Sequence, residues 1–412
     1  MEKFDLGVVG AGPAGYTAAI NAAQQGLKVV LFEKDKPGGV CLNRGCIPTK
    51  TILHSAEVFE DLKCASDIGI FVENAAVDFS KVMEHKDKTV EKLRKSLELM
   101  LKNAGVQIVS AEAKIIDART ITANSQKYEC EKIISAVGSE PCAPKGIVFD
   151  HKFILNSDDI LKLKALPKSI VIVGSGAIGT EWARIFNAFG TEVTVVELSE
   201  HLLPLADVEV SKRVERIFKT KKIKFYTSTC VEKVHDGILA LSNGETISPD
   251  CVLVATGRKP LTSEKVPGVK YIGDVCGEIQ LAHYAIKQAL CETCELLYNK
   301  DLIPSVVYGN PEIAWAGLRE QDLTPGEYQK STVLISALGK SHCDNSTDGF
   351  IKILAQNDKI AGVHIVSKEA SALIHEVLIA MQNDVSVSKL KEVCFAHPTY
   401  SEGIFECLSR LQ

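Results

Sequence analysis

The feature that most constrains the fold is a glycine pattern that occurs twice in the chain. Both copies read G-x-G-x-x-G, the first at residues 10–15 and the second at residues 174–179. Each copy follows an apolar run typical of a buried strand and precedes a run typical of a helix. A second apolar run then ends in an acid, Glu33 or Glu197. The first glycine and that acid are 23 positions apart in both copies (10 to 33, and 174 to 197).

Strand, tight turn, helix, strand and terminal acid are the parts of a dinucleotide-binding unit. The glycines let the backbone approach a pyrophosphate at the helix N-terminus, and the acid accepts hydrogen bonds from ribose hydroxyls. Two units indicate two dinucleotides, and FAD with a nicotinamide cofactor is the natural pair. Glu197 would repel a 2′-phosphate, and residues 198–201 contain no arginine to receive one. The expected nicotinamide cofactor is therefore NAD rather than NADP.

Two cysteines, Cys41 and Cys46, lie in the glycine-rich stretch 38–50. A disulfide needs Cα atoms roughly 4.4–6.8 Å apart, whereas five steps along a regular α-helix rise about 7.5 Å. Because Pro48 suits the first turn of a helix, we expect Cys41 on the entry turn and Cys46 at or near the helix start. There the helix dipole favours a thiolate, which suits electron transfer. The alternative is a pair of ordinary buried cysteines.

The segments between and after the two units carry weaker signals. Residues 58–104 read as helical, and short strands are expected at 106–109, 120–122 and 132–136. The second unit is expected to end at residues 252–258. Residues 271–274 read as a strand ending in an acid, followed by a helix over 281–297. Asp274 is then placed to meet a ribityl hydroxyl or a phosphate-bound water; it could also cap that helix, and the two roles are compatible.

Beyond residue 304 the pattern changes to alternating apolar residues, which indicates an antiparallel sheet flanked by two helices. Its strands are expected at 331–337, 350–355 and 360–366. Near the end of the chain, His397 precedes a proline and Glu402 follows five residues later. This arrangement suits an oriented general base. The alternative is a histidine and a carboxylate paired on the surface.

Composition excludes several classes of function. The 412 residues are 46% hydrophobic and 24% charged, with a formal net charge of −5, so nucleic acid and anionic membranes are not expected partners. No apolar run approaches the roughly 18 residues of a membrane helix. The 13 cysteines are mostly isolated, which favours free thiols in a reducing compartment, the cytoplasm. Cys291 and Cys294 form a C-x2-C without a second ligand pair, so helix packing is favoured over zinc and no metal is expected.

Taken together, these motifs resemble the pyridine nucleotide–disulfide oxidoreductases, and among them the members that oxidise dihydrolipoyl groups. The resemblance implies an α/β fold with two Rossmann-like dinucleotide-binding domains, for FAD and NAD, and a C-terminal α+β dimerisation domain. The expected boundaries are 1–144 for the first part of the FAD domain, 145–258 for the NAD domain, 259–303 for a shortened second FAD-domain part and 304–412 for the dimerisation domain. The matching stretches run in the family's order at residues 10–15, 38–50, 174–181, 255–258, 273–275, 281–283 and 397–402.

The resemblance also implies roles for individual residues. Cys46 is the flavin-side sulfur, Cys41 the interchange thiol, and Lys50 reaches the flavin and pairs with Glu181. His397, held by Glu402 and preceding a cis proline, shuttles the thiol proton and is contributed by the second subunit of a homodimer. The expected FAD contacts are Gly10, Gly12, Gly15, Glu33, Gly39, Lys50, Ala113, Gly138, Asp274, Ala282 and His283. The expected NAD contacts are Gly174, Gly176, Ile178, Gly179, Glu181, Glu197 and Gly257.

The chain also departs from the family pattern. It is some fifty or sixty residues shorter than full-length relatives, mainly between Arg258 and Gly273 and also around residues 234–241, so edge strands near the first gap are in doubt. Val40 and Val137 replace the usual threonines, and each replacement removes a hydroxyl near the flavin. We expect a modest effect of these two replacements on flavin affinity or potential.

The implied reaction is the oxidation of dihydrolipoyl groups by NAD, through a redox disulfide and FAD. The implied partners are lipoyl domains of a 2-oxo acid dehydrogenase or glycine cleavage complex. One alternative is a reductase of the glutathione or mercuric type, although Cys407 stands alone near the C-terminus, where mercuric reductases carry a cysteine pair. Another is a degenerate flavoprotein kept as a non-catalytic subunit, although all expected active-site residues are present.

Overall fold

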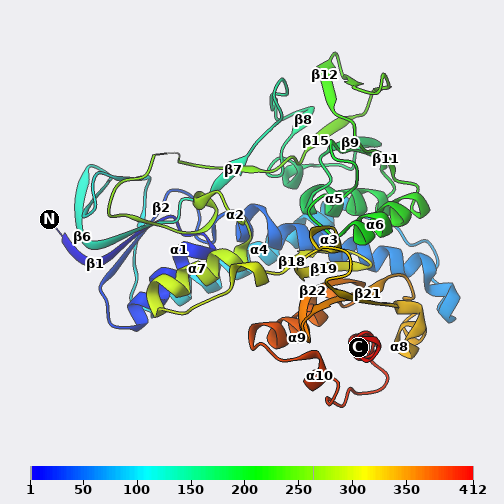
Figure 1. The fold of residues 1–412 in the computed structure, drawn as a ribbon. Coiled ribbons are helices and arrows are strands. Elements are labelled where there is room, and N and C mark those ends of the chain that lie inside the picture. Colours follow the sequence, from blue (N-terminus) through cyan, green and yellow to red (C-terminus); the bar gives the residue numbers. More distant parts are fainter. Residues whose placement is uncertain (1, 263, 412) are drawn as a thin grey trace.

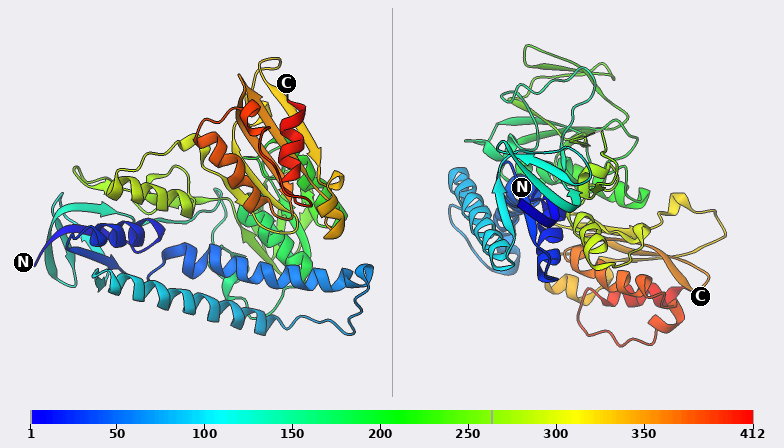
Figure 2. Two further views of the ribbon diagram at one scale, coloured as in Figure 1. Left: turned by 90° about the horizontal axis from the view of Figure 1, so that it is seen from below. Right: turned by 90° about the vertical axis from the view of Figure 1, so that its left-hand side faces the viewer.

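A computed structural model describes residues 2–262 and 264–411. Three main sheets, each with its own helices, are arranged around a shared centre (Figure 1). Two long antiparallel helices run side by side beneath all three (Figure 2). The mixed α/β architecture is the expected one. Within the described residues, no helix is both long enough and apolar enough to cross a membrane.

The first sheet contains the first glycine unit. Strands β3-β2-β1-β6 are parallel neighbours, β17 pairs with the end of β6, and antiparallel β5 and β4 extend from its start. Helices α1 (Pro13–Gln24) and α7 (Ala282–Cys294) pack together. The strands are β1 (Glu2–Val9), β2 (Val29–Glu33), β3 (Gln107–Ser110), β4 (Ala113–Ile115), β5 (Thr120–Ala123), β6 (Gln126–Ser135) and β17 (Lys270–Tyr271).

The second sheet contains the second glycine unit and is parallel throughout, in the order β11-β10-β9-β15-β8. Its strands are β8 (Ile154–Leu155), β9 (Ser169–Val173), β10 (Glu192–Val196), β11 (Lys224–Tyr226) and β15 (Cys251–Val254), with helices α5 (Ala177–Ala188) and α6 (Val208–Thr220). A small antiparallel sheet, β12 (Val231–His235), β13 (Ile238–Leu241) and β14 (Thr246–Ile247), lies at the periphery.

Two short strands lie between these units. β7 (Ser139–Pro141) and β16 (Arg258–Pro260) pair antiparallel. β17 joins β6 of the first sheet. Strand pairing is therefore present at both ends of the segment between Arg258 and Gly273, where the resemblance implies a shortening.

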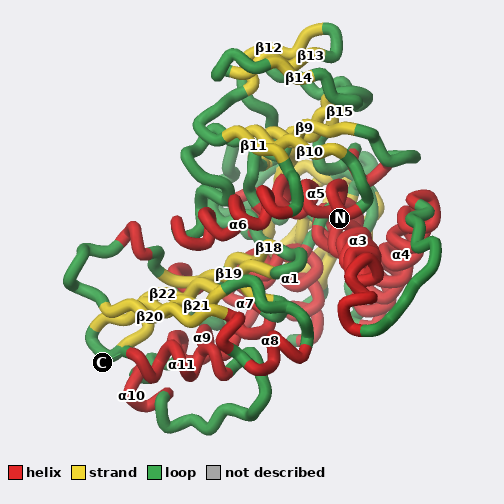
Figure 3. Tube along the Cα trace, turned by 90° about the vertical axis from the view of Figure 1, so that its right-hand side faces the viewer, coloured by secondary structure: helices red, strands yellow, loops and turns green. Residues whose placement is uncertain are grey.

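The third sheet is antiparallel in the order β18-β19-β22-β21-β20. Helices α9 (Ala370–Gln382) and α11 (Glu402–Arg410) cover one face (Figure 3), and α8 (Gly339–Cys343) and α10 (Val387–Leu390) are short. The sequence pattern missed β18 and β19, and residues 335–337 form a 3-10 turn instead of strand. The strands are β18 (Ser305–Val307), β19 (Glu312–Gly317), β20 (Gln329–Leu334), β21 (Phe350–Gln356) and β22 (Lys359–Ser367).

The expected continuous helix over 58–104 was wrong in its middle. Helix α3 (Cys46–Cys64) and the 3-10 turn that follows it (Ala65–Ile68) end before Gly69, and the next helix, α4 (Phe79–Asn103), begins only at Phe79. Gly69 has φ 83°, a conformation that favours glycine and ends a helix. The side chain of Asp78 accepts a hydrogen bond from the Lys81 amide and so caps α4. The result is an antiparallel helical hairpin.

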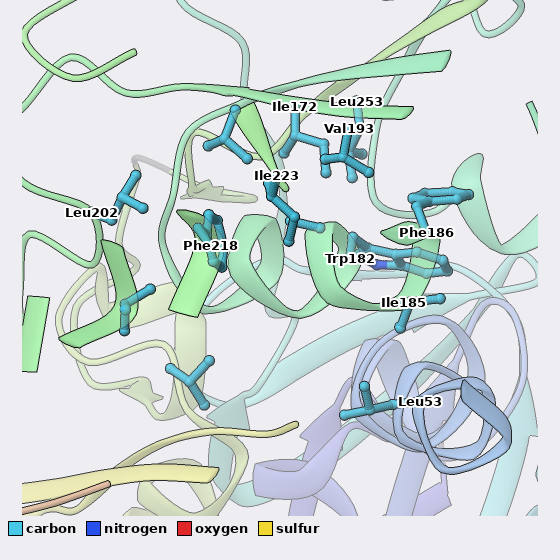
Figure 4. Packing of buried hydrophobic residues seen from close by; sticks show 14 of the residues in the cluster. Leu53, Ile172, Trp182, Ile185, Phe186, Val193, Leu202, Phe218, Ile223 and Leu253 are labelled. Atoms are coloured by element: carbon cyan, nitrogen blue, oxygen red, sulfur yellow. The ribbon is translucent and has the colours of Figure 1, made fainter. Parts of the chain in front are cut away.

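Helix α5 is sandwiched between the second sheet and α3. Trp182 and Phe186 are buried and pack toward sheet residues such as Ile172, while Leu53 of α3 lies beyond Ile185 on the other side (Figure 4). Because both sides of α5 are covered, even its charged residues are buried. This position brings the second unit against the helix that carries Cys46.

A buried charge cluster joins the second and third sheets. Lys352 of β21 and Asp207, the N-cap of α6, are each 1% exposed, and their charged atoms lie 2.8 Å apart. Burial raises the pKa of Asp207, but the hydrogen bond from Lys352, the neighbouring His364 and the hydrogen bond from the Glu320 amide together outweigh burial, so the pKa is lowered. Glu320 also contacts Lys352, and hydrogen bonds from Lys330 and Lys352 overcome its burial and hold its pKa at about 2. His364 lies beside Asp207, and burial lowers its pKa to about 4.

We expect Lys352→Met to lower the free energy of unfolding by about 3–5 kcal/mol, because it leaves buried carboxylates without their cation. Lys330→Met is the matched control, because Lys330 pairs with the same Glu320 but is 45% exposed, and we expect an effect within about 1 kcal/mol. Urea unfolding at pH 7 measures both variants. Equal losses in the two variants would contradict the buried cluster as a stabilising unit.

Acid should weaken the wild-type protein through the same cluster. Buried His364 has a depressed pKa, so its contribution is lost as the pH falls from about 6.5 to about 4. Glu320 also has a depressed pKa, so its contribution is present above about 4.3 and is lost as the pH falls toward 2.

Candidate active site

Cys41 and Cys46 lie on two consecutive helices separated by one glycine. Cys41 is inside the short helix α2 (Gly39–Arg44), and Cys46 is the first residue of α3. The expected position of Cys46 is confirmed, whereas the expected entry turn of Cys41 is itself a helix. Gly38 and Gly39 have φ of 107° and 59°, which lets the chain enter α2 abruptly. The helical break at Gly45 removes the geometric obstacle to a bond between the two sulfurs.

The two sulfurs are present as thiols and share a hydrogen bond. This bond lowers the pKa of Cys46 to about 7, against the effect of burial, and the ammonium of Lys50 acts in the same direction. The same bond, together with burial, raises the pKa of Cys41. Cys46 is therefore the thiolate of the pair, stabilised by the Cys41 hydrogen bond and by the ammonium of Lys50.

Lys50 is held one turn along α3 from Cys46. Its Nζ lies 2.8 and 2.7 Å from the two carboxylate oxygens of Glu181 on α5 and 4.8 Å from the centre of the Tyr308 ring. Burial lowers the pKa of Lys50, but the charge and the hydrogen bond of Glu181, together with smaller effects of Cys46 and Tyr308, outweigh burial, so the pKa is raised and the ammonium is retained. The backbone N–H of Tyr308 donates to Glu181 Oε1 at 3.1 Å.

One cavity of about 2090 Å³ is lined by both glycine units and by both cysteines. Its volume exceeds the 300–1,000 Å³ or so of a pocket for one small ligand, so it has room for two dinucleotides. Gly10 and Gly174 have the same role in the two units. A Cβ on Gly10 would lie 2.4 Å from the Ala136 carbonyl, and one on Gly174 would lie 2.7 Å from the Ala255 carbonyl.

The two terminal acids are held in the same way. Glu33 accepts from the amides of Ala11 and Asp35 at 2.8 and 2.9 Å. Glu197 accepts from the amides of Ser175 and Ser199, both at 2.8 Å, and also from the Ser175 hydroxyl at 2.7 Å. Each acid is therefore fixed at the edge of the cavity, next to its own glycine turn.

Asp274 does not cap the helix that follows it, so the capping role was wrong. It lies in a 3-10 turn (Gly273–Cys276), and α7 begins only at Ala282. The Asp274 carboxylate accepts from the Ser139 hydroxyl at 2.6 Å, and Arg258 Nε lies 2.8 Å from that hydroxyl. Val40 and Val137, where the resemblance predicts threonines, both line the cavity.

The cavity collects most of the expected cofactor contacts but not all. Gly15 and Gly179 do not line the cavity. Each lies against its own unit instead, since a Cβ on either would lie within 2 Å of the carbonyl oxygen of the first glycine of that unit. These two glycines instead allow close packing of helix on strand. The expected contacts that line it are Gly10, Gly12, Glu33, Gly39, Lys50, Ala113, Gly138, Asp274, Ala282, His283, Gly174, Gly176, Ile178, Glu181, Glu197 and Gly257.

His397 and Glu402 form a pair away from this cavity. His397 Nδ1 lies 2.9 Å from Glu402 Oε1, and the Thr399 amide donates to Glu402 Oε2 at 2.8 Å. These two hydrogen bonds lower the pKa of Glu402, so it stays charged. The His397–Pro398 peptide is cis. His397 is 76% exposed and does not line the cavity that Cys41 and Cys46 line, so it does not reach the cysteines of its own chain.

Sequence reasoning missed several residues around the site. Tyr308 and Arg184 lie behind the Lys50–Glu181 pair, and Ser175 holds Glu197. Tyr16 lies near both cysteines, and burial and their charges raise its pKa. Of these missed residues, only Ser175 could have been noticed in the sequence, because it lies inside the second glycine motif. Among the described residues, no group of three or more His, Cys, Asp or Glu side chains is placed to hold a metal ion.

Comparison with known proteins places this geometry in context. The pyridine nucleotide-disulphide oxidoreductase family matches residues 4–270, and the dimerisation domain of that family matches residues 303–407. The chain is 33% identical to the dihydrolipoyl dehydrogenase of Chlamydia trachomatis, over 97% of this chain and 95% of that protein. It is 35% identical to the mitochondrial dihydrolipoyl dehydrogenase of Pisum sativum, over 98% and 91%. Its fold resembles that of LpdA from Mycobacterium tuberculosis, with a TM-score of 0.91, 23% identity, and coverage of 100% and 99%.

Proposed function

The chain belongs to the pyridine nucleotide-disulphide oxidoreductase family, and on this premise we propose that it oxidises dihydrolipoyl groups and reduces NAD to NADH. The observation that carries the proposal is the cysteine pair on the wall of the cavity into which both dinucleotide units open. The cavity volume and the glycine cradles fit FAD and NAD, the cofactors of this family. The chemistry that a bound FAD would supply is acceptance of an electron pair from the dithiol and transfer of hydride to NAD.

The protein side chains carry the thiol chemistry. His397 of a second subunit accepts a proton from a substrate thiol on Nε2, because Nδ1 faces Glu402. The substrate thiolate attacks Cys41 Sγ of the oxidised pair, and Cys46 leaves as a thiolate. The second substrate thiol then transfers its proton to the departing Cys41 sulfur and attacks the substrate sulfur of the mixed disulfide. This forms the cyclic lipoyl disulfide and releases Cys41 as a thiol, in line with its raised pKa. Lys50 stabilises the Cys46 thiolate, which matches the lowered pKa of that thiol.

We assign the cofactor contacts to the cavity-lining residues named above, with Gly15 and Gly179 acting through packing. The active form is a homodimer, in line with the family description of residues 303–407. Its substrates are lipoyl domains of a 2-oxo acid dehydrogenase or glycine cleavage complex, and its location is the cytoplasm. The domains keep the boundaries 1–144, 145–258, 259–303 and 304–412.

The mercuric-type alternative finds little support. Cys407 is fully buried, donates to the Ile351 carbonyl at 3.1 Å, and has a pKa raised to about 12 by burial. A thiol in that state is a poor metal ligand. The non-catalytic alternative is disfavoured because the cysteines, Lys50, Glu181 and the His397–Glu402 pair are all formed.

Steady-state rates test the proposal. We expect turnover with dihydrolipoamide and NAD, and little reduction of glutathione disulfide or Hg(II) by NADH or NADPH. The kcat/KM for NAD should exceed that for NADP by about a hundredfold, because Glu197 would face a 2′-phosphate. Glu197→Gln, which removes only the charge, should narrow that ratio. Faster turnover of glutathione disulfide than of lipoamide would overturn the proposed substrate.

A further inference from the structure

Helix α5 presents two buried charges on one face. Glu181 and Arg184 are three residues apart, so their side chains are neighbours on the helix surface. They are only 2% and 4% exposed. The mechanism above uses Glu181 but leaves Arg184 without a role.

Both side chains hold the same turn, residues 308–311 between β18 and β19. Glu181 Oε1 accepts from the Tyr308 amide at 3.1 Å, and Arg184 Nη1 donates to the Pro311 carbonyl at 2.6 Å. Gly309 makes room for the guanidinium, because a Cβ there would lie 2.4 Å from Arg184 Nη1. The turn is therefore fixed to α5 at both ends.

The 308–311 turn also contacts the dithiol site, by which we mean Cys41, Cys46 and the Lys50–Glu181 pair beside them. Tyr308 places its ring 4.8 Å from Lys50 Nζ, and Lys50 bonds both oxygens of Glu181. Arg184 thus acts on the same pair in two ways. It anchors the turn that borders Lys50 and Glu181, and its charge offsets that of Glu181.

The stability of the fold does not by itself explain why an arginine is present at position 184. Its Nε and Nη2 have no hydrogen-bond acceptor among the described residues, and burial lowers its pKa to about 10. An apolar side chain of similar volume often replaces a buried charge without loss of stability. A cation kept there is better explained by its effect on the neighbouring carboxylates, of which Glu181 acts most strongly on Arg184, followed by Glu60, Glu57 and Asp348.

We propose that Arg184 is a positioning residue of the dithiol site, which holds the 308–311 turn and offsets Glu181 so that Lys50 acts fully on the Cys46 thiolate. Both effects of Arg184 change the pKa of Cys46 in the same direction, because each lowers it. Without Arg184, the turn loosens around Lys50, and the Glu181 charge acts more strongly on Cys46. Each change raises the pKa of Cys46.

The test uses the FAD-loaded protein with Cys41→Ser, which leaves Cys46 as the single thiol of the pair. The long-wavelength absorbance of a thiolate beside the flavin is titrated with pH, with and without Arg184→Met. We expect Arg184→Met to raise the midpoint by about 0.5–1 pH unit. Arg216→Met, an exposed arginine on α6, should leave the midpoint unchanged. In a Lys50→Met background, Arg184→Met should have at most half its effect.

Two outcomes would overturn the inference. One is a midpoint that Arg184→Met does not move, and the other is an equal shift with and without Lys50. The inference rests on the proposed function, but the two fail differently. A complete absence of the absorbance band in the Cys41→Ser protein contradicts the placement of Cys46 beside a flavin, whereas a band with an unmoved midpoint contradicts only the role of Arg184.

Discussion

Cys46→Ser is expected to reduce turnover of dihydrolipoamide by at least about a thousandfold, and changing both cysteines should cost no more than changing one. The reason is that the two sulfurs act as one unit. Each must form and break the same bond, so the loss of either ends the reaction. The shared hydrogen bond, which lowers the pKa of Cys46 and raises that of Cys41, already couples them in the dithiol form.

The chain offers a matched control and a direct readout. Cys64→Ser changes the exposed cysteine that ends the same helix α3 and should leave turnover unchanged. Trypsin cleaves after Arg44, so Cys41 and Cys46 fall on separate peptides. Iodoacetamide should label the Cys41 peptide only after reduction by dihydrolipoamide. Turnover of Cys46→Ser within tenfold of wild type, or equal labelling before and after reduction, would contradict the dithiol mechanism.

Local sequence predicted the two glycine units well because each position has a local steric reason. Gly10 and Gly174 lie against carbonyls that a side chain would strike, and both acids reach amides of their own turn. The helical break at Gly69 was missed because long helical runs precede and follow it, and one glycine lowers the preference for helix only modestly.

Residues that meet only through tertiary structure could not be predicted in this way. Arg184 and Pro311 are 127 positions apart, as are Glu181 and Tyr308, and no periodicity relates them. The Lys50–Glu181 pair spans 131 positions and was expected only because the motifs resemble a known family. The burial of α5 between a sheet and α3 brings all of these residues together.

Substitution of His397 is expected to give the second large loss of turnover. Cys41 and Cys46 line the cavity of their own chain, whereas His397 does not. If a second subunit supplies the base, His397→Ala should lower turnover about a hundred- to ten-thousandfold, the range for a lost general acid–base group. His85→Gln, an exposed histidine on α4, is the control and should have no effect.

Mixing two inactive variants distinguishes a shared site from a site within one chain. When His397→Ala and Cys46→Ser chains are unfolded together in equal amounts and refolded, half of the dimers should contain one of each. In such a dimer, the site with the intact cysteine pair from the His397→Ala chain receives the intact histidine from the Cys46→Ser chain. Activity should therefore return to about a quarter of the wild-type value, since one site in two is complete in half of the dimers. If every site used its own histidine, the mixture would stay as inactive as its components, and the two-fold arrangement proposed for this enzyme would be wrong.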